Sequence, residues 1–210
     1  STTMASNGSF SAFEEGYPVW YFRGYQVDHL DEKGNPVFRD NDKNGVIDAS
    51  DKAMIGKPMP DFTYGVTLAA NYKNFDLLVF GNGSVGNDVF MSYSYNHIFY
   101  PLKEIYDQRW TPDGSTNRKY ARPQLTNADK YGLSDAYIFD GSYFRIKQIQ
   151  LGYTFPKKLI KHALLENVRV YASLDNFFLF TKYPGLDPEV SSTSTSGMGV
   201  DYGNYPTTKK

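Results

Sequence analysis

The sequence has no cysteine and only three histidines in 210 residues. The absence of cysteine excludes disulfide bonds and thiolate metal sites. The histidines, His29, His97 and His162, have neither the spacing of metal ligands nor that of a catalytic triad. A formal match to a glycine-rich phosphate loop, Gly81 to Gly86, precedes no helix-forming segment and is rejected. These absences predict a protein that is not an enzyme.

The chain also lacks long hydrophobic runs and any excess of one charge. No segment approaches the roughly 20 apolar residues that a membrane-spanning helix needs, although spanning β-strands leave no such signal. The formal net charge of −1 leaves no electrostatic footprint for nucleic acid. The sequence begins without methionine and without a signal peptide, so we expect a fragment or a processed chain. Aromatic residues are abundant, at 17%, which fits sugar-binding surfaces or the aromatic girdles of an outer-membrane barrel.

The segment 143–155 shows the alternation of a half-buried strand. In its second half, one side carries Ile149, Leu151, Tyr153 and Phe155, and the other carries glutamine, glycine and threonine. Successive strand side chains point to opposite faces, so the segment has one apolar and one polar face. Such a strand fits a barrel between lipid and a wet lumen. On periodicity alone, half of a soluble β-sandwich fits at least as well.

Four further segments have strand character, at about 17–27, 62–72, 75–84 and 167–176. Short links join 62–72 to 75–84 and 143–155 to 167–176, whereas long segments lie at about 28–61, 85–142 and 177–210. Outer-membrane barrels alternate short periplasmic turns with long extracellular loops in this way. We therefore predict an all-β fold, an antiparallel transmembrane β-barrel segment whose long segments are extracellular loops.

The polar segment 40–51 has the spacing of a calcium-binding loop. Its pattern of oxygen ligands around a glycine suits a hard cation. The sharp turn falls at Gly45, and aspartate replaces the usual glutamate at the last position. An aspartate-rich turn without metal is the alternative. The predicted Ca²⁺ ligands are Asp40, Asp42, Asn44, Val46 through its carbonyl, Asp48 and Asp51.

Several phrases occur in an order and spacing that resemble one family. They are Asp-Phe-Thr-Tyr-Gly at 61–65, Asp-Gly-Ser-Tyr-Phe-Arg-Ile-Lys at 140–147, Leu-Gly-Tyr-Thr-Phe-Pro at 151–156, Val-Tyr-Ala-Ser-Leu-Asp-Asn at 170–176, and Tyr-Pro-Gly-Leu-Asp-Pro-Glu-Val at 183–190. Together they resemble the C-terminal end of the SusC/RagA family of TonB-linked outer-membrane transporters of Bacteroidetes. The resemblance covers residues 17–206.

The resemblance implies a large plugged barrel of roughly 22 strands in the outer membrane. It implies import of oligosaccharides, or of peptides, with energy relayed by TonB and with a SusD-like surface lipoprotein as partner. This chain would supply C-terminal barrel strands and outer loops over residues 1–210. The plug and the TonB-contact segment of the family have no counterpart in it. An open sheet edge is a hazard for aggregation, so we expect stability only within the remaining barrel.

Aromatic side chains in the long segments are candidates for stacking on sugar rings of a cargo. The candidates are Tyr93, Tyr95, Tyr100, Trp110 and Tyr120. Packing between loops, or against the lipoprotein, is the competing interpretation of each. A second functional hypothesis also stays open at this point, namely a soluble, calcium-stabilised carbohydrate-binding β domain.

Overall fold

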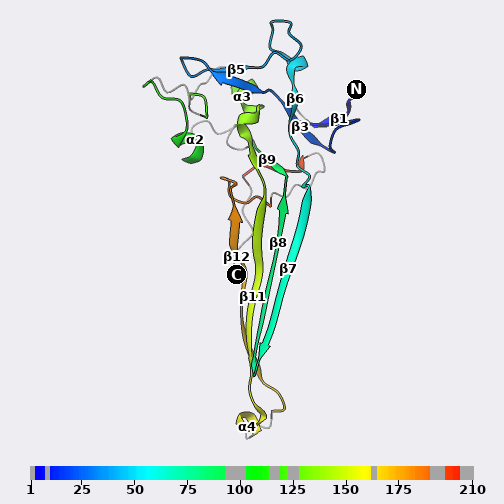
Figure 1. Ribbon diagram of the computed structural model, residues 1–210, viewed down its shortest axis with the longest axis vertical. Coiled ribbons are helices and arrows are strands. Elements are labelled where there is room, and N and C mark those ends of the chain that lie inside the picture. Colours follow the sequence, from blue (N-terminus) through cyan, green and yellow to red (C-terminus); the bar gives the residue numbers. More distant parts are fainter. Residues whose placement is uncertain are drawn as a thin grey trace.

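The computed structural model describes residues 3–7, 10–92, 103–113, 119–122, 128–161, 165–189 and 197–203. It has two parts, a long four-stranded antiparallel sheet and a folded cap at one end of that sheet (Figure 1). In the described part of the chain, no helix has the length and apolar character needed to cross a membrane.

The long sheet has the strand order β12-β11-β8-β7. Two long hairpins form it, and they meet along β8 and β11. Its strands are β7 (Phe62–Tyr72), β8 (Phe75–Val85), β11 (Tyr143–Thr154) and β12 (Arg169–Thr181). The alternation of 62–72 and 75–84 thus marks real strands, and β12 runs five residues beyond the predicted end at 176.

A bulge in β11 keeps its apolar side chains on one face of the sheet. The register pairs Ile146 with Gly81 and Ile149 with Val79, and it shifts between Ile146 and Gln148. Because Gly81 and Val79 lie two residues apart on β8, Ile146 and Ile149 point to the same side despite their odd separation. The bulge explains why the alternation in the sequence changes parity near Lys147.

The ends of the hairpins opposite the cap form the turn end of the sheet. Lys73 and Asn74 close the first hairpin, and the positive φ of Lys73 suits a tight two-residue turn. The second hairpin closes through the short helix α4 (Lys157–Ile160). The Thr154 amide donates to the Asn74 carbonyl at 2.8 Å, so the two turns are held together.

The cap consists of short elements from three stretches of the chain. Sheet β1-β2-β3-β6 is formed by strands from the N-terminal stretch, and β4 pairs with β5. Sheet β10-β9-β13 combines β9 and β10, which lie between β8 and β11 in the chain, with β13, which follows β12. The strands are β1 (Thr3–Asn7), β2 (Ser11–Glu14), β3 (Tyr21–Gly24), β4 (Val27–Leu30), β5 (Pro36–Phe38), β6 (Ala53–Gly56), β9 (Asp88–Met91), β10 (Ile138–Asp140) and β13 (Val200–Asp201). The helices are η1 (Ala49–Asp51), α2 (Lys103–Asp107), α3 (Ala128–Gly132) and η2 (Asp135–Tyr137).

The single strand predicted at 17–27 is wrong, because the chain changes partner within it. β3 ends at Gly24, whose missing side chain allows close approach to Leu133. The Tyr25 amide then donates to the Leu133 carbonyl at 2.9 Å, and β4 begins in another sheet. These contacts join residues more than a hundred positions apart, so local periodicity did not reveal them.

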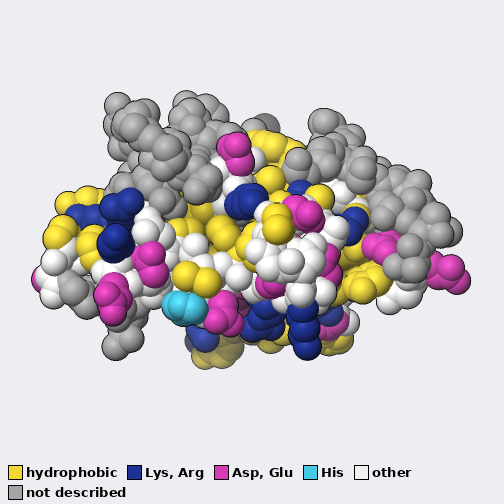
Figure 2. All heavy atoms as spheres, turned by 90° about the horizontal axis from the view of Figure 1, so that it is seen from above, with side chains coloured by type: hydrophobic (Ala, Val, Ile, Leu, Met, Phe, Trp, Pro, Cys, Tyr) yellow, Lys and Arg dark blue, Asp and Glu magenta, His cyan; other side chains and the backbone are white. Residues whose placement is uncertain are grey.

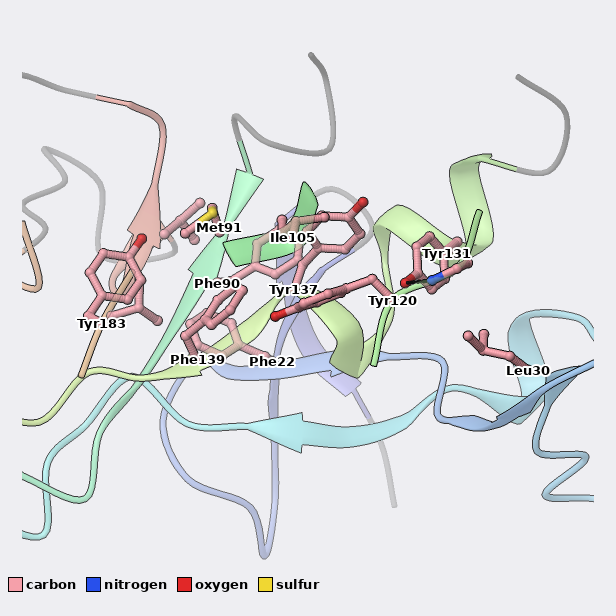
Figure 3. Close-up of a cluster of buried hydrophobic side chains, with 13 residues drawn as sticks. Phe22, Leu30, Phe90, Met91, Ile105, Tyr120, Tyr131, Tyr137, Phe139 and Tyr183 are labelled. Atoms are coloured by element: carbon pink, nitrogen blue, oxygen red, sulfur yellow. Dashed lines mark hydrogen bonds between the residues drawn. The ribbon is translucent and has the colours of Figure 1, made fainter. Parts of the chain in front are cut away.

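Among the described residues, the hydrophobic core lies in the cap and not behind the long sheet. Phe22, Phe90, Tyr120, Tyr137 and Phe139 meet in it from separate elements (Figure 3). The segments predicted as long loops therefore contribute to a packed core. Seen from above, the cap shows acidic and basic side chains interspersed with apolar ones (Figure 2).

Candidate functional site

The segment 40–51 connects β5 to β6 at the tip of the cap, far from α4 (Figure 1). Its backbone folds around aspartate oxygens. The Gly45 amide donates to Asp40 Oδ2 at 2.8 Å, and the Asn44 amide donates to Asp42 Oδ1 at 3.1 Å. Gly45 has φ +83°, a conformation that glycine adopts without strain. The sharp turn predicted at this position is confirmed.

Three carboxylates converge inside this loop. Asp40, Asp42 and Asp51 each present an oxygen within 4.8 Å of the others. Desolvation, followed by the charges of Asp51 and Asp40, raises the pKa of Asp42. The backbone amides of Asp48 and Asn41 donate to the fully buried Asp51 carboxylate, which lowers its pKa. None of the ion pairs in the described part of the chain neutralises these three carboxylates. Convergent oxygens of this kind fit a hard cation.

Two of the other predicted ligands make hydrogen bonds within the loop. Asp48 lies outside the carboxylate cluster and is the N-cap of η1, where it accepts from the Ser50 amide at 2.7 Å. The Asn44 side-chain oxygen accepts from the Val46 amide at 2.7 Å. The Asp-x-x-Asp spacing at 48–51 resembles a capping box, and this signal could have predicted the cap.

The loop is also attached to the cap from outside. The Lys130 ammonium group, on α3, donates to the Ile47 carbonyl at 2.5 Å. Asn41 anchors the start of the loop to its end, because its side-chain amide donates to the Asp51 carbonyl at 2.6 Å. The loop is thus a connector with both ends fixed.

The structure corrects the proposed ligand-stacking role of Tyr120. Its side chain is 1% exposed and belongs to the core of the cap (Figure 3). Trp110 is half-buried, packs against that core, and its ring lies against Gly34. Packing therefore explains both aromatic side chains. The other three candidates, Tyr93, Tyr95 and Tyr100, lie outside the described residues.

One face of the long sheet, the apolar face, carries almost only apolar side chains. No described element of the chain covers it, since Leu68 is 63% exposed, Leu151 51% and Val170 59%. A β-sandwich would bury these residues between two layers, so the structure does not support that alternative. By register, the face consists of Phe62, Tyr64, Val66, Leu68, Ala70, Tyr72, Val85, Gly83, Gly81, Val79, Leu77, Phe75, Phe144, Ile146, Ile149, Leu151, Tyr153, Phe180, Phe178, Leu174, Ala172 and Val170.

Aromatic rings border this apolar face at both ends. Near the cap, Tyr64 stacks on Phe144 with ring centroids 5.8 Å apart, and Phe144 stacks on Phe180 at 6.3 Å. The Tyr64 ring reaches over Gly83, where a side chain would leave no room for it. Near the turns, the Phe75 and Tyr153 rings are in contact, with their centroids 4.7 Å apart. Two aromatic rows flanking an apolar band are typical of strands that span a bilayer.

The opposite, polar face holds charged groups that sequence reasoning had not singled out. Arg145 is 3% exposed and forms ion pairs of 2.5 Å with Asp187 and with Glu189. These pairs hold the segment after β12 against β11. At the turn end, Arg169 pairs with Asp76 at 2.5 Å across the missing side chain of Gly152. The face also contains apolar residues such as Leu78 and Phe80.

Comparison with known proteins agrees with this architecture. No protein-family model matches the chain. It is 34% identical to TonB-dependent receptor P3 of Formosa agariphila over 191 residues, which are 83% of this chain and 18% of that protein. It is 33% identical to TonB-dependent receptor SusC of Bacteroides thetaiotaomicron over 209 residues, which are 97% of this chain and 20% of that protein.

Among solved structures, the RagAB peptide importer in its closed-closed state shares the fold. The TM-score is 0.72 at 22% identity, and the match covers 99% of this chain and 24% of that one. The open-open state gives a TM-score of 0.73 at 24% identity, covering 98% of this chain and 23% of that one. The chain spans about a fifth of the length of the curated relatives that it matches. These relatives are receptors and not enzymes, as the sequence predicts. The chain therefore belongs to the SusC/RagA family of TonB-dependent receptors and is a β-barrel segment of the outer membrane.

Proposed function

We propose that this chain is the C-terminal barrel portion of a TonB-dependent importer of oligosaccharides or peptides, which works with a SusD-like surface lipoprotein. The exposed apolar face of the long sheet carries this proposal. Exposed leucine and valine side chains in the middle of a strand are costly in water and favourable in lipid. The polar face would then border the lumen through which cargo passes.

The difference between the two ends of the sheet supports an orientation. One end carries the cap, and the other ends in a two-residue turn and a short helix. Short turns of outer-membrane barrels face the periplasm, and long connections face outside. The cap would therefore be extracellular, where a lipoprotein partner and incoming cargo would meet it.

Growth on defined nutrients tests the import function and the class of cargo. A strain lacking the receptor would be compared with a complemented strain, and with a TonB-deficient strain, on oligosaccharides or peptides as the sole source of the nutrient. We expect receptor-dependent and TonB-dependent growth on one class, and co-purification of a surface lipoprotein with the tagged receptor. Equal growth of all three strains on both classes of nutrient would contradict the proposal.

We also propose that the loop 40–51 binds Ca²⁺ as a structural ion. Support comes from the three convergent carboxylates, which have no cationic partner in the described part of the chain. Asp40, Asp42 and Asp51 would hold the ion, and it would neutralise their mutual repulsion. The fixed ends of the loop favour a stabilising role over a sensing one.

Hydrogen exchange of the loop amides in the intact receptor tests this assignment. For a Kd of about 10⁻⁴–10⁻³ M, about 2 mM Ca²⁺ should raise protection roughly 3- to 20-fold. Asp42→Asn, at an exposed position, should remove this gain. Asp28→Asn, an exposed aspartate elsewhere in the cap, is the matched control and should keep it. Equal protection of wild type in calcium and in chelator would refute the assignment.

A further inference from the structure

The turn end of the long sheet carries a group of lysines directly beyond the aromatic row. Lys73 follows Tyr72 in the first turn, and Lys157, Lys158 and Lys161 follow Phe155 in and after α4. The hydrogen bond between the two turns brings both sets to the same end of the sheet. The four lysines thus follow, in both turns, the aromatic residues that border the apolar face.

These lysines differ from the other cations of the long sheet. Arg145 and Arg169 each have carboxylate partners. In contrast, no ion pair within the described part of the chain involves the four lysines. Glu166 is the one acidic residue among the described side chains that line the hollow around α4. The turn end therefore carries net positive charge that the described chain does not neutralise.

Apolar side chains accompany this charge. Leu159 is 68% exposed and Leu165 is 53% exposed, while Ile160 between them is buried. Leu165 and the three lysines of the second turn line a hollow of about 520 Å³. A purely solvated turn would explain the lysines but not the two exposed leucines. An interface between acyl chains and charged headgroups explains both, because lysine reaches to phosphates while leucine enters the apolar layer.

We propose that the turn end binds the headgroup phosphate of an anionic phospholipid in the leaflet at that end of the barrel. The lysines would pair with the phosphate, and the leucines would contact its acyl chains. Continuity with the apolar face and complementary charge identify this occupant. The inference rests on the membrane placement in the proposed function and is independent of the cargo.

Native mass spectrometry of the delipidated intact receptor tests the site. The receptor would be titrated with phosphatidylglycerol, with zwitterionic phosphatidylcholine, and with phosphatidylglycerol in the presence of millimolar inorganic phosphate. A lysine near an anionic lipid surface contributes about a fivefold gain in affinity. The triple variant Lys157→Gln, Lys158→Gln, Lys161→Gln should therefore bind phosphatidylglycerol about 100-fold more weakly.

A matched triple variant controls for loss of charge alone. Lys33→Gln, Lys103→Gln and Lys119→Gln change three exposed lysines of the cap and should leave lipid affinity unchanged. Equal affinity of wild type for the two lipids would overturn the inference, even if the turn variant failed to fold. The inference would also be overturned if both triple variants lost the same affinity for phosphatidylglycerol. Displacement of the lipid by inorganic phosphate would overturn it as well. Cargo uptake by strains that carry the wild-type receptor or these variants is a separate readout. If the receptor shows no lipid selectivity but cargo uptake is intact, only this inference is refuted.

Discussion

Leu68→Arg should destabilise the receptor strongly, and Thr67→Arg should not. Leu68 lies at the middle of β7, four residues from Tyr64 and four from Tyr72, on the apolar face. At about 3.3 Å per residue, the two tyrosines lie roughly 26 Å apart along the strand. A strand tilt of about 35–45° reduces this to roughly 19–22 Å across the membrane, which is most of an apolar band about 25 Å tall. Leu68 would therefore lie near the bilayer midplane.

An arginine at that depth costs about 2–4 kcal/mol, whereas the cost falls to about 0–1 kcal/mol near the interface. On a water-exposed sheet, the same change would stay within about 0.5 kcal/mol. Thr67 is its neighbour on the polar face, so Thr67→Arg controls for strand position and for side-chain size. Tyr72→Arg, at the border of the apolar face, should give an intermediate cost below about 1 kcal/mol.

The measurement is urea-dependent folding of the intact receptor into phospholipid vesicles, followed by heat-modifiable electrophoretic mobility. The ratio of folded to unfolded receptor should fall roughly 30- to 1000-fold for Leu68→Arg under conditions where Thr67→Arg resembles wild type. If both arginine variants fold equally well, Leu68 does not face lipid, and the membrane assignment of the apolar face is refuted.

Three further substitutions test the packing. Gly83→Ala should cost about 1–3 kcal/mol, because the added methyl would clash with the backbone carbonyl oxygen of Tyr143 and would also meet the Tyr64 ring at 2.7 Å. Gly65→Ala, where the nearest atom to the added methyl is 3.7 Å away, should be nearly neutral in the same urea assay. Arg145→Ala should cost about 1.5–3 kcal/mol, because it removes the buried guanidinium that pairs with the Asp187 and Glu189 carboxylates, and a urea midpoint within error of wild type would contradict this. Burial raises the pKa of Asp88, so its ionised form opposes folding as pH rises above the unfolded value of about 3.9. Asp88→Asn should therefore raise the unfolding temperature near pH 7 and leave it unchanged near pH 3, and a gain that does not depend on pH would exclude this explanation.

The long sheet was predictable because each strand carries its own evidence. Alternation between two faces is a property of neighbouring residues, so β7 could be located from its own sequence. The loop 40–51 could also be predicted from its own sequence, because its turn and its convergent carboxylates follow from short spacings. The role of Asp48 as a cap was missed because the calcium pattern and the capping pattern use the same residue types.

The sequence by itself determined the two-sided strands, the oxygen-rich loop and the family. The tertiary structure alone decided that no described element covers the apolar face, that Tyr120 is buried in a core, and that Arg145 holds the segment after β12. The physical reason is the range of the interactions. Strand alternation arises within a few residues, whereas burial and ion pairing depend on segments that meet only after the whole chain has folded.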